Sequence, residues 1–454
     1  MNYITPLILI QLSNRFRWVF CQLEILRHCL PSSVRRFLEE LPESLDETYE
    51  RVLREIKKPN QDHARRLLQC LVVAIRPLRV EELAEVLAVD FDDAEGIPRL
   101  NPGWRWEDQD QALLTSCSSL LTIVGTDHCR IVQFSHFSVK EYLTSARLAS
   151  STQDLSRYHI SLEPAHTVLA QACLGILLQP EIPIEPTAVA KLSPLAGYAA
   201  EHWVVHAQFE NVSLRLRQAM EYLFDPDRPH FTAWLQLHDV DIDPNAESTL
   251  FEFTPILKSA STPLYYAALC GFQHPVEQLI VKYPQHVDAI GGYYMTPAVA
   301  ALAGRSFRLA QLLHRSGSSV DPQGDFNKTP LHSAAYYGDV EMVQILLDCK
   351  ANVNARAERG STPLGFALSG PYRGDTRVVR LLLGHGADPN IPALRGLTPL
   401  HHASEKGWIE VVRLLIEHGA SVEVKDNDGR TPLDVASGEQ HEEIIKLLLE
   451  HHSK

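Results

Sequence analysis

The sequence predicts a mainly α-helical protein: a front half of helices with a β-hairpin, then an α-helical connector, then a solenoid of repeated helix pairs. Two observations predict this class. The dipeptide Thr-Pro recurs at a nearly constant spacing through the second half, and apolar residues recur at helical spacing through most of the first half. The length of 454 residues equals about three ordinary domains and agrees with a chain of several parts.

The second half is built from a sequence repeat. Six Thr-Pro pairs between Thr262 and Thr431 are separated by 34, 33, 33, 36 and 33 residues, and the motif Thr-Pro-Leu-His is complete at Thr329–His332 and Thr398–His401. This period and this motif resemble the ankyrin repeat, which implies stacked pairs of short helices. The six pairs begin at Thr262, Thr296, Thr329, Thr362, Thr398 and Thr431.

Each position of the repeat has a physical role. Thr329 is expected to cap the first helix, and Pro330 suits the first helical position because its missing N–H costs no hydrogen bond there. Gly338 is expected to end that helix, and residues 343–347 supply the apolar side of the second helix. Gly386 fits the left-handed position after a helix end. The repeat therefore predicts two helices that bury their apolar sides against neighbouring repeats.

The fourth repeat carries three extra residues, since its spacing is 36 rather than 33. They fit best around Gly370–Gly374, between the two helices of that repeat. Insertions in solenoids fall on loops, often at a binding face. Tyr372 and Arg373 are therefore candidate partner-binding residues.

Further candidates are the residues just before the glycine that ends each first helix, because these positions are expected to face a partner on the concave side. They are Leu269 with Cys270, Leu302 with Ala303, Tyr336 with Tyr337, and Glu405 with Lys406. The adjacent tyrosines Tyr336 and Tyr337 are the strongest, because Tyr supplies contact area and a hydrogen bond at low entropic cost. The alternative is that they only cover the neighbouring repeat.

The front half shows helical patterns and one hairpin. The expected helices cover residues 35–57, with a break marked by Pro42 and Ser44, and residues 63–75, 81–89 and 113–121. A last helix, capped by Ser135 or Ser138, runs to Leu143. Two apolar strands, residues 121–124 and 130–134, flank a turn at Gly125–His128. Helices followed by such a hairpin describe a winged helix.

Three segments of this region, Leu41–Tyr49, Ala74–Leu83 and Phe134–Leu143, resemble the winged-helix part of fungal NACHT proteins (STAND-class NTPases) that carry ankyrin repeats. Phe16–Leu23 and Tyr198–Trp203 are similar to the segments before and after it. A similar winged-helix segment is named after GPI inositol-deacylase.

The resemblance gives a role to one histidine. In such proteins, the histidine of a Phe-x-His-x-Ser pattern contacts the phosphate of a bound nucleotide, and His136 is the matching residue here. His136 is thus the one candidate for cofactor binding. The alternative is that His136 only forms hydrogen bonds in the corner between the hairpin and the next helix.

The chain lacks the motif that a nucleotide-binding core needs. A P-loop has the pattern G-x-x-x-x-G-K-[ST], and no glycine of this chain is followed by lysine. We therefore expect the C-terminal part of a NACHT-like receptor, either a truncated gene product or a family member without its NTPase core. No cofactor is expected for the chain itself.

Composition argues against other functions. The net charge of −14 and the acidic helix expected at residues 81–89 argue against nucleic-acid binding. The longest apolar stretch, residues 168–178, is about half of the ~20 residues that a membrane span needs, and no signal peptide is expected. The eight cysteines include no C-x-x-C pair and are expected to be reduced core thiols. A cytoplasmic location is expected, with a nuclear one left open.

No catalytic motif is found. The hydrolase pattern G-x-S-x-G is absent, because Gly370 and Gly374, which alone have that spacing, enclose Tyr372. His202 and His206 have a metal-ligand spacing on an expected helix, but no third ligand is evident. We therefore expect neither an enzyme nor a metal site.

These inferences predict a four-part chain: a helical remnant at residues 1–60, a winged-helix-like domain at 61–150, a helical connector at 151–245 and ankyrin repeats at 246–454. About six repeats are expected, starting near residues 261, 295, 328, 361, 397 and 430. The predicted function is a non-catalytic scaffold, or the ligand-sensing half of a NACHT-like receptor, that binds a protein on the concave ankyrin face. A nucleotide-dependent signalling switch is the alternative if the native gene is longer at its N-terminus.

Overall fold

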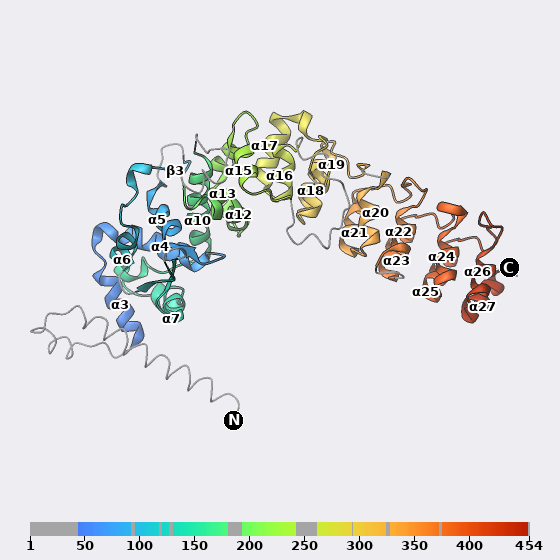
Figure 1. The fold of residues 1–454 in the computed structure, drawn as a ribbon, viewed down its shortest axis with the longest axis horizontal. Coiled ribbons are helices and arrows are strands. Elements are labelled where there is room, and N and C mark those ends of the chain that lie inside the picture. The colour runs from blue at the N-terminus through green and yellow to red at the C-terminus, as the bar shows by residue number, and fades with distance from the viewer. Residues whose placement is uncertain are drawn as a thin grey trace, which may run out of the picture. The chain divides into compact units, whose positions relative to one another are not determined.

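The computed structural model (Figure 1) forms two compact units, Met1–Asp239 and Val240–Lys454. It describes residues 44–91, 96–117, 120–126, 130–179, 193–241, 261–292, 294–323, 327–371 and 375–452. Phe16–Leu23 and the first part of the helix expected at 35–57 lie outside the described residues.

The first unit begins with helices around a small sheet. Its described helices in this part are α3 (Leu45–Glu55), α4 (Gln61–Val73), α5 (Val80–Glu85), α6 (Gln109–Cys117) and α7 (Phe137–Leu143). The strands are β1 (Leu78–Arg79), β4 (Leu121–Val124) and β5 (Ile131–Phe134), which form an antiparallel sheet in the order β1-β5-β4. Val132 of β5 lies opposite both Leu78 and Ile123, so the predicted hairpin is confirmed and packs beside a third strand.

Three details of this part differ from the expected elements. The helix expected at 113–121 is α6, which covers Gln109–Cys117, and Leu121 instead begins β4. The helix expected at 81–89 ends at Glu85, because Val86–Ala88 form a 3₁₀ turn and β2 (Val89–Asp90) pairs with β3 (Arg99–Leu100). The helix after the hairpin is capped by His136 rather than by a serine. His136 has an extended backbone (φ −157°, ψ 152°), so its imidazole Nδ1 reaches the Ser138 amide as an Asn or Asp oxygen would.

The rest of the first unit is a helical connector. Its described helices are α8 (Ala146–Ala149), α9 (Gln153–Ser156), α10 (Leu162–Leu177), α12 (Ala196–Ala207), α13 (Val212–Arg215), α14 (Arg217–Leu223) and α15 (His230–Leu237). The helix α10 packs against both α4 and α12, so it joins the connector to the helices before it. Trp203 and Trp234 are fully buried with ring centroids 5.3 Å apart, and Phe224 packs on both. This aromatic core lies where the helices α12, α14 and α15 meet.

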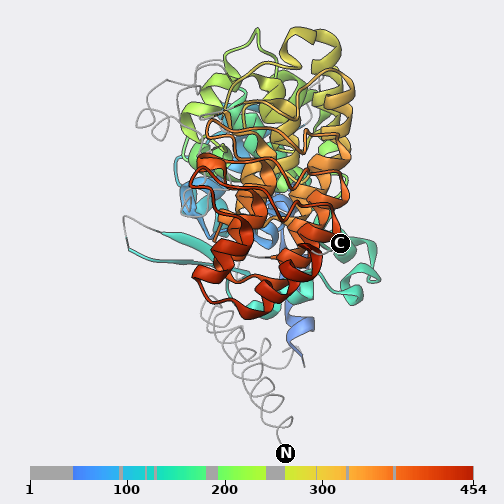
Figure 2. The ribbon, with the colours of Figure 1, turned by 90° about the vertical axis from the view of Figure 1, so that its right-hand side faces the viewer.

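The described part of the second unit contains six helix pairs in chain order (Figure 1). Its first helices are α16 (Pro263–Leu269), α18 (Pro297–Ala303), α20 (Pro330–Tyr336), α22 (Pro363–Ser369), α24 (Pro399–Lys406) and α26 (Pro432–Gly438). Its second helices are α17 (Gln273–Lys282), α19 (Phe307–Arg315), α21 (Val340–Asp348), α23 (Thr376–Gly384), α25 (Ile409–Glu417) and α27 (Glu442–His452). Figure 2 views this stack from its last repeat, with the helix pairs behind one another.

The local chemistry expected from Thr-Pro is present. Every first helix starts with Pro at its first position and Thr as its cap, and the Thr362 hydroxyl, for example, accepts a hydrogen bond from Gly365 N. Gly386 and Gly419 follow second helices with φ of +88°, the left-handed region in which glycine is favoured. The repeat positions therefore act as the sequence predicts.

The insertion in the fourth repeat lies between its two helices, as expected. Residues 370–375 separate α22 from α23, whereas only residues 337–339 separate α20 from α21. At the start of the insertion, a Cβ on Gly370 would lie 1.8 Å from the Tyr336 carbonyl oxygen. Glycine at 370 thus lets the backbone after α22 approach the end of α20 closely.

Candidate functional site

Two histidines join consecutive repeats beneath the candidate binding surface. In α20, His332 Nδ1 accepts a hydrogen bond from Thr329 N (3.0 Å), while Nε2 lies 3.2 Å from the carbonyl oxygen of Ser361 in the next repeat. In α24, His401 Nε2 lies 3.0 Å from the Arg430 carbonyl oxygen in the same way. A neutral imidazole with a protonated Nε2 satisfies both contacts. The Leu-His part of the motif therefore provides a hydrogen bond between repeats.

Burial keeps these imidazoles neutral. Both rings have no exposed surface, and the loss of solvation lowers the pKa of His332 to about 4 and also lowers the pKa of His401. Protonation of Nδ1 would place a proton against the Thr amide that it accepts from. The junctions between repeats are thus built for the neutral form.

The candidate surface is the first-helix face, which we define as the first helices α16 to α26 together with the loops that precede them. An aromatic cluster lies on it, formed by Tyr336, Tyr337 and Phe366. The Tyr336 ring centroid is 5.0 Å from that of Tyr337 and 6.3 Å from that of Phe366. All three side chains are half-buried, so they support one another and still present surface to solvent. A half-buried aromatic group held by neighbours is a typical hot spot for binding.

A cavity of about 320 Å³ opens beside the aromatic cluster. It is lined by Lys328, Tyr336, Ala357, Glu358, Arg359, Ser361, Phe366 and Ser369. Lys328 Nζ lies 5.7 Å from the Phe366 ring centroid, within reach of a cation–π interaction. The cavity therefore combines two aromatic rings from neighbouring repeats with charged side chains at its edge.

The other predicted partner-binding residues have mixed surroundings. Leu269 is half-buried, and Glu405 and Lys406 form an ion pair of 2.7 Å at the end of α24. Tyr372 and Arg373 lie outside the described residues. The expectation that Cys270 and Leu302 face a partner is wrong: they are 4% and 0% exposed, because apolar side chains at this position pack into the adjoining repeats.

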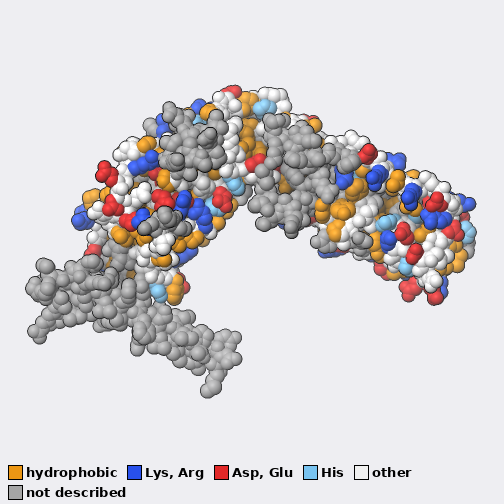
Figure 3. All heavy atoms as spheres, viewed as in Figure 1, with side chains coloured by type: hydrophobic (Ala, Val, Ile, Leu, Met, Phe, Trp, Pro, Cys, Tyr) orange, Lys and Arg blue, Asp and Glu red, His pale blue; other side chains and the backbone are white. Residues whose placement is uncertain are grey.

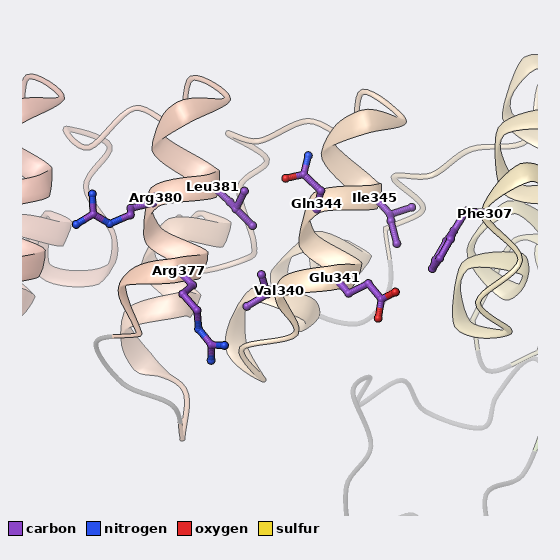
Figure 4. A pocket seen from close by; sticks show the side chains of 8 residues that line it. All are labelled: Phe307, Val340, Glu341, Gln344, Ile345, Arg377, Arg380 and Leu381. Atoms are coloured by element: carbon purple, nitrogen blue, oxygen red, sulfur yellow. The ribbon is translucent and has the colours of Figure 1, made fainter.

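We call the surface formed by the second helices α17 to α27 the second-helix face. It carries a groove across α19, α21 and α23 (Figure 4). Its lining includes Phe307 from α19, Val340 and Ile345 from α21, and Leu381 from α23. Two of the charged residues that line this groove have near partners, since Glu341 pairs with Arg305 (2.9 Å) and Arg377 pairs with Asp375 (2.7 Å). The groove has no enclosed aromatic pair, so it makes a weaker candidate site than the first-helix face.

In the winged helix, His136 has a structural partner. Its Nδ1 lies 2.6 Å from Ser138 Oγ, which in turn lies 2.9 Å from the Tyr49 hydroxyl. This chain of contacts ties α7 to α3 and uses Nδ1 of the ring. The phosphate-contacting role that the family resemblance gives to His136 stays a prediction.

Two of the three acidic side chains of α5, Glu82 and Glu85, are buried in the first unit, whereas Glu81 is partly exposed. Glu82 has no exposed surface and accepts hydrogen bonds from Arg76 (2.8 and 2.9 Å) and from Arg79 (3.0 Å), which hold the pKa of its carboxyl below its ordinary value against the opposing effect of burial. Glu85 pairs with Arg105 in the same unit. These carboxylates stabilise the fold through ion pairs, and α5 itself contains no Lys or Arg side chain that could contact bases in DNA.

A second polar cluster lies between α10 and α12. His206 Nδ1 is 2.8 Å from His166 Nδ1, and His206 Nε2 is 2.9 Å from the Tyr198 hydroxyl. Burial lowers the pKa of His206 to about 3, so the imidazole is neutral near pH 7. His202, which has a metal-ligand spacing with His206 in the sequence, packs its ring edge-on against Tyr198. Across the described ranges, no group of three or more His, Cys, Asp or Glu side chains has a metal-binding arrangement.

Two further properties follow from the described residues. The five cysteines among them, Cys70, Cys117, Cys173, Cys270 and Cys349, are buried free thiols. In this part of the chain, every helix is too short or too polar to cross a lipid bilayer.

A part of each unit matches a known protein family. Residues 49–153 match the family described as "GPI inositol-deacylase, winged helix domain". Residues 297–393 and 370–454 match the family described as "Ankyrin repeats (3 copies)". The chain therefore has a winged-helix domain in its N-terminal part and ankyrin repeats in its C-terminal part, and the predicted fold class is confirmed.

A curated relative covers part of the chain. The protein named "Azaphilone pigments biosynthesis cluster protein L", from Monascus ruber, is 32% identical over 282 residues. The alignment includes 58% of this chain and 57% of the relative. The chain thus matches little more than half of that fungal protein's length.

Sequence reasoning identified Tyr336 but missed the residues that complete its cavity. Phe366 belongs to the next repeat, and Lys328 and Arg359 come from loops that precede first helices. A signal was present: in stacked repeats, a residue near the end of one first helix adjoins the next first helix and its loop. A comparison of two consecutive repeats would have predicted that Phe366 lies near Tyr336.

Proposed function

We propose that this chain is a non-catalytic interaction protein that binds a protein partner on the first-helix face of its ankyrin repeats. The observation that carries the proposal is the cavity beside the aromatic cluster, where Tyr336 and Phe366 of neighbouring repeats are held half-exposed. Ordered aromatic side chains lose little entropy on binding, so they are suited to anchor a partner. The ankyrin family match supports the same function, because stacked repeats form extended binding surfaces.

The absence of a hydrolase motif in the sequence supports a non-catalytic function. The resemblance to NACHT proteins and the winged-helix match support a position in the ligand-sensing part of such a receptor. A cytoplasmic location belongs to the same proposal, since buried free thiols suit a reducing compartment.

Partner capture by the full chain tests this proposal. The double variant Tyr336→Ala/Tyr337→Ala is compared with the wild type in a pull-down from cells of the native organism, with bound proteins quantified by mass spectrometry. We expect the variant to lose specific partners while its thermal unfolding curve is nearly unchanged, because both side chains lie at the surface of α20.

The matched control is Gln344→Ala/Ile345→Ala on the second-helix face, which is expected to retain those partners. Equal capture by all three proteins would contradict the proposal. A large fall in the unfolding temperature of the tyrosine variant would instead assign the pair to packing between repeats.

A nucleotide-dependent signalling switch is a second candidate, favoured by the winged-helix match and by His136 at the start of α7. It requires a P-loop, and the sequence contains none. Genomic sequence upstream of residue 1 tests it: an in-frame Gly-Lys-Thr or Gly-Lys-Ser motif after a glycine-rich turn would favour the switch, and its absence would remove this candidate.

A further inference from the structure

We infer that the first-helix face at the third and fourth repeats recognises an acidic segment of a protein partner, with one aromatic or aliphatic side chain seated in the cavity beside Tyr336 and Phe366. This inference rests on the proposed function and specifies the partner's chemistry. It is carried by the size of the cavity, by its aromatic walls and by the charges around it.

The cavity fits a side chain rather than a folded domain. Its volume of about 320 Å³ is at the small end of the range of ligand pockets, about 300–1,000 Å³. Tyr336 forms one side and Phe366 another, and their ring centroids are 6.3 Å apart. An apolar side chain that enters would bury surface against both rings, as an anchor residue does. The rest of the partner segment would then lie along the neighbouring loops.

Parts of those loops carry an excess of cations although the chain is acidic overall, while Asp321 and Asp388 occupy other positions of the loops before α20 and α24. Lys328 and Arg359 line the cavity, and Arg356 and Arg395 lie on the loops before α22 and α24. In the loop segments that contain these four cations, residues 327–328, 355–361 and 392–397, Glu358 is the one acidic residue. Figure 3 shows Lys and Arg side chains gathered along the loops near α20 and α22.

The helices beside these loops, and the loop of the last repeat, differ from them in charge. The helices α20 and α22 carry no charged residue. In the last loop the arginine is already neutralised, because Arg430 pairs with Asp426 (2.9 Å) and Asp428 (3.1 Å). The chain as a whole has a net charge of −14. A local positive surface on such a chain favours encounter with an acidic segment and disfavours a basic one.

An acidic protein segment fits these features better than a nucleic acid. Nucleic-acid affinity depends on many phosphate contacts, and the net negative charge of the chain opposes a long polyanion. A cavity lined by two aromatic rings and two cations, with Arg356 and Arg395 on the same loops, instead matches a short segment with a few carboxylates and one anchor. Carboxylates would pair with Arg359 and Lys328 while the anchor fills the cavity.

Selection from a displayed library of random 12-residue peptides tests the inference. The full chain is the target, and peptides that also bind the Tyr336→Ala/Phe366→Leu variant are removed. We expect the surviving peptides to be enriched in Asp and Glu around one aromatic or aliphatic residue. Survivors without an acidic excess would overturn the inference and leave the proposed function standing. The failure of any peptide to bind through the aromatic pair would overturn both.

Charge reversal provides the second measurement, by fluorescence anisotropy with a selected acidic peptide. Lys328→Glu and Arg359→Glu are each expected to weaken binding about tenfold, with a larger loss at low salt than at high salt. Arg380→Glu, which makes the same charge change on the second-helix face, is the matched control and is expected to bind as the wild type does. Equal weakening by all three reversals, or an oligonucleotide of 12 thymidines that binds as tightly as the peptide, would overturn the inference.

Discussion

The two units differ in the polar groups that they bury. In the winged-helix and connector unit two carboxylates are buried in ion pairs: Glu82 is completely buried between two arginines, and Glu85 is 3% exposed beside Arg105. In the described part of the ankyrin unit the completely buried groups include the neutral His332 and His401, while Asp426 is a buried carboxylate that pairs with Arg430. The aromatic cluster of the ankyrin unit stays half-exposed, and we therefore expect a partner to contact the repeats.

The two units also differ in how far apart in the sequence their packed elements are. In the first unit, α10 contacts elements that are far apart in the sequence, including α4, β3 and α12. In the second unit each helix pair packs on its own partner and on the adjoining pairs. Loss of one core side chain should therefore disturb the whole first unit, whereas the repeats should respond locally.

The largest expected effect is at Trp203 in the first unit. Trp203→Ala removes a fully buried ring that packs on Trp234 and Phe224, and should lower the free energy of unfolding of that unit by about 3–5 kcal/mol. Urea denaturation of the full chain, followed by near-UV circular dichroism, measures it. Leu214→Ala is the control, because Leu214 is 67% exposed and its loss should have little effect. A small change at Trp203 would contradict the cooperative core assigned to this unit.

The next effect concerns pH and the neutral histidines of the repeats. Burial lowers the pKa of His332 to about 4, below the ordinary value of about 6.5 that it has when unfolded. Between these values the unfolded chain binds more protons, so the unfolding free energy should fall as pH drops from about 6.5 to 4. We expect His332 to account for about 2 kcal/mol of this loss.

Urea titrations at pH 7 and pH 4.5 compare the wild type with His332→Gln, which cannot take up this proton. The variant should start less stable at pH 7 and lose less stability on acidification. The control is His385→Gln, a change at an exposed histidine. The same slope of stability against pH in the wild type and in His332→Gln would mean that the junction does not depend on a neutral imidazole.

The sequence predicts those structural features that depend on residues within one repeat, and it does not predict those that depend on contacts between repeats. The caps at Thr329 and Thr398 and the glycine turns followed from the motif, because each depends on neighbours within a few residues. The hydrogen bond from His332 to Ser361 and the cavity at Phe366 depend on how consecutive repeats stack, which one repeat does not specify.

In the first unit the hairpin was predictable from alternating apolar residues, whereas the cap at His136 was not. Serine is the statistical choice for a cap, but the extended backbone at His136 lets an imidazole take the same place. The buried Glu82 gave no signal either, since an acidic first turn in a helix also suits a solvent-exposed surface.

The smallest expected effect on stability is at a single helix cap in the repeats. Thr362→Ala removes the hydroxyl that accepts a hydrogen bond from Gly365 N and should cost about 1 kcal/mol of unfolding free energy. Thr362→Ser retains the hydroxyl and should recover most of this loss. Thermal unfolding of the full chain compares the three proteins. If the serine variant were no more stable than the alanine variant, the stabilisation would come from the threonine methyl group instead of from the cap.

Site-specific photo-cross-linking tests the central claim, that recognition lies on the first-helix face, most directly. A benzophenone amino acid is placed in the full chain at residue 369, where the exposed Ser369 lines the cavity, or at residue 344 on the second-helix face. After irradiation in cells of the native organism, the account predicts a discrete partner adduct from position 369 that the Tyr336→Ala/Tyr337→Ala changes abolish, and little or none from position 344. Adducts mainly from position 344, or adducts from 369 that survive loss of the tyrosines, would contradict it.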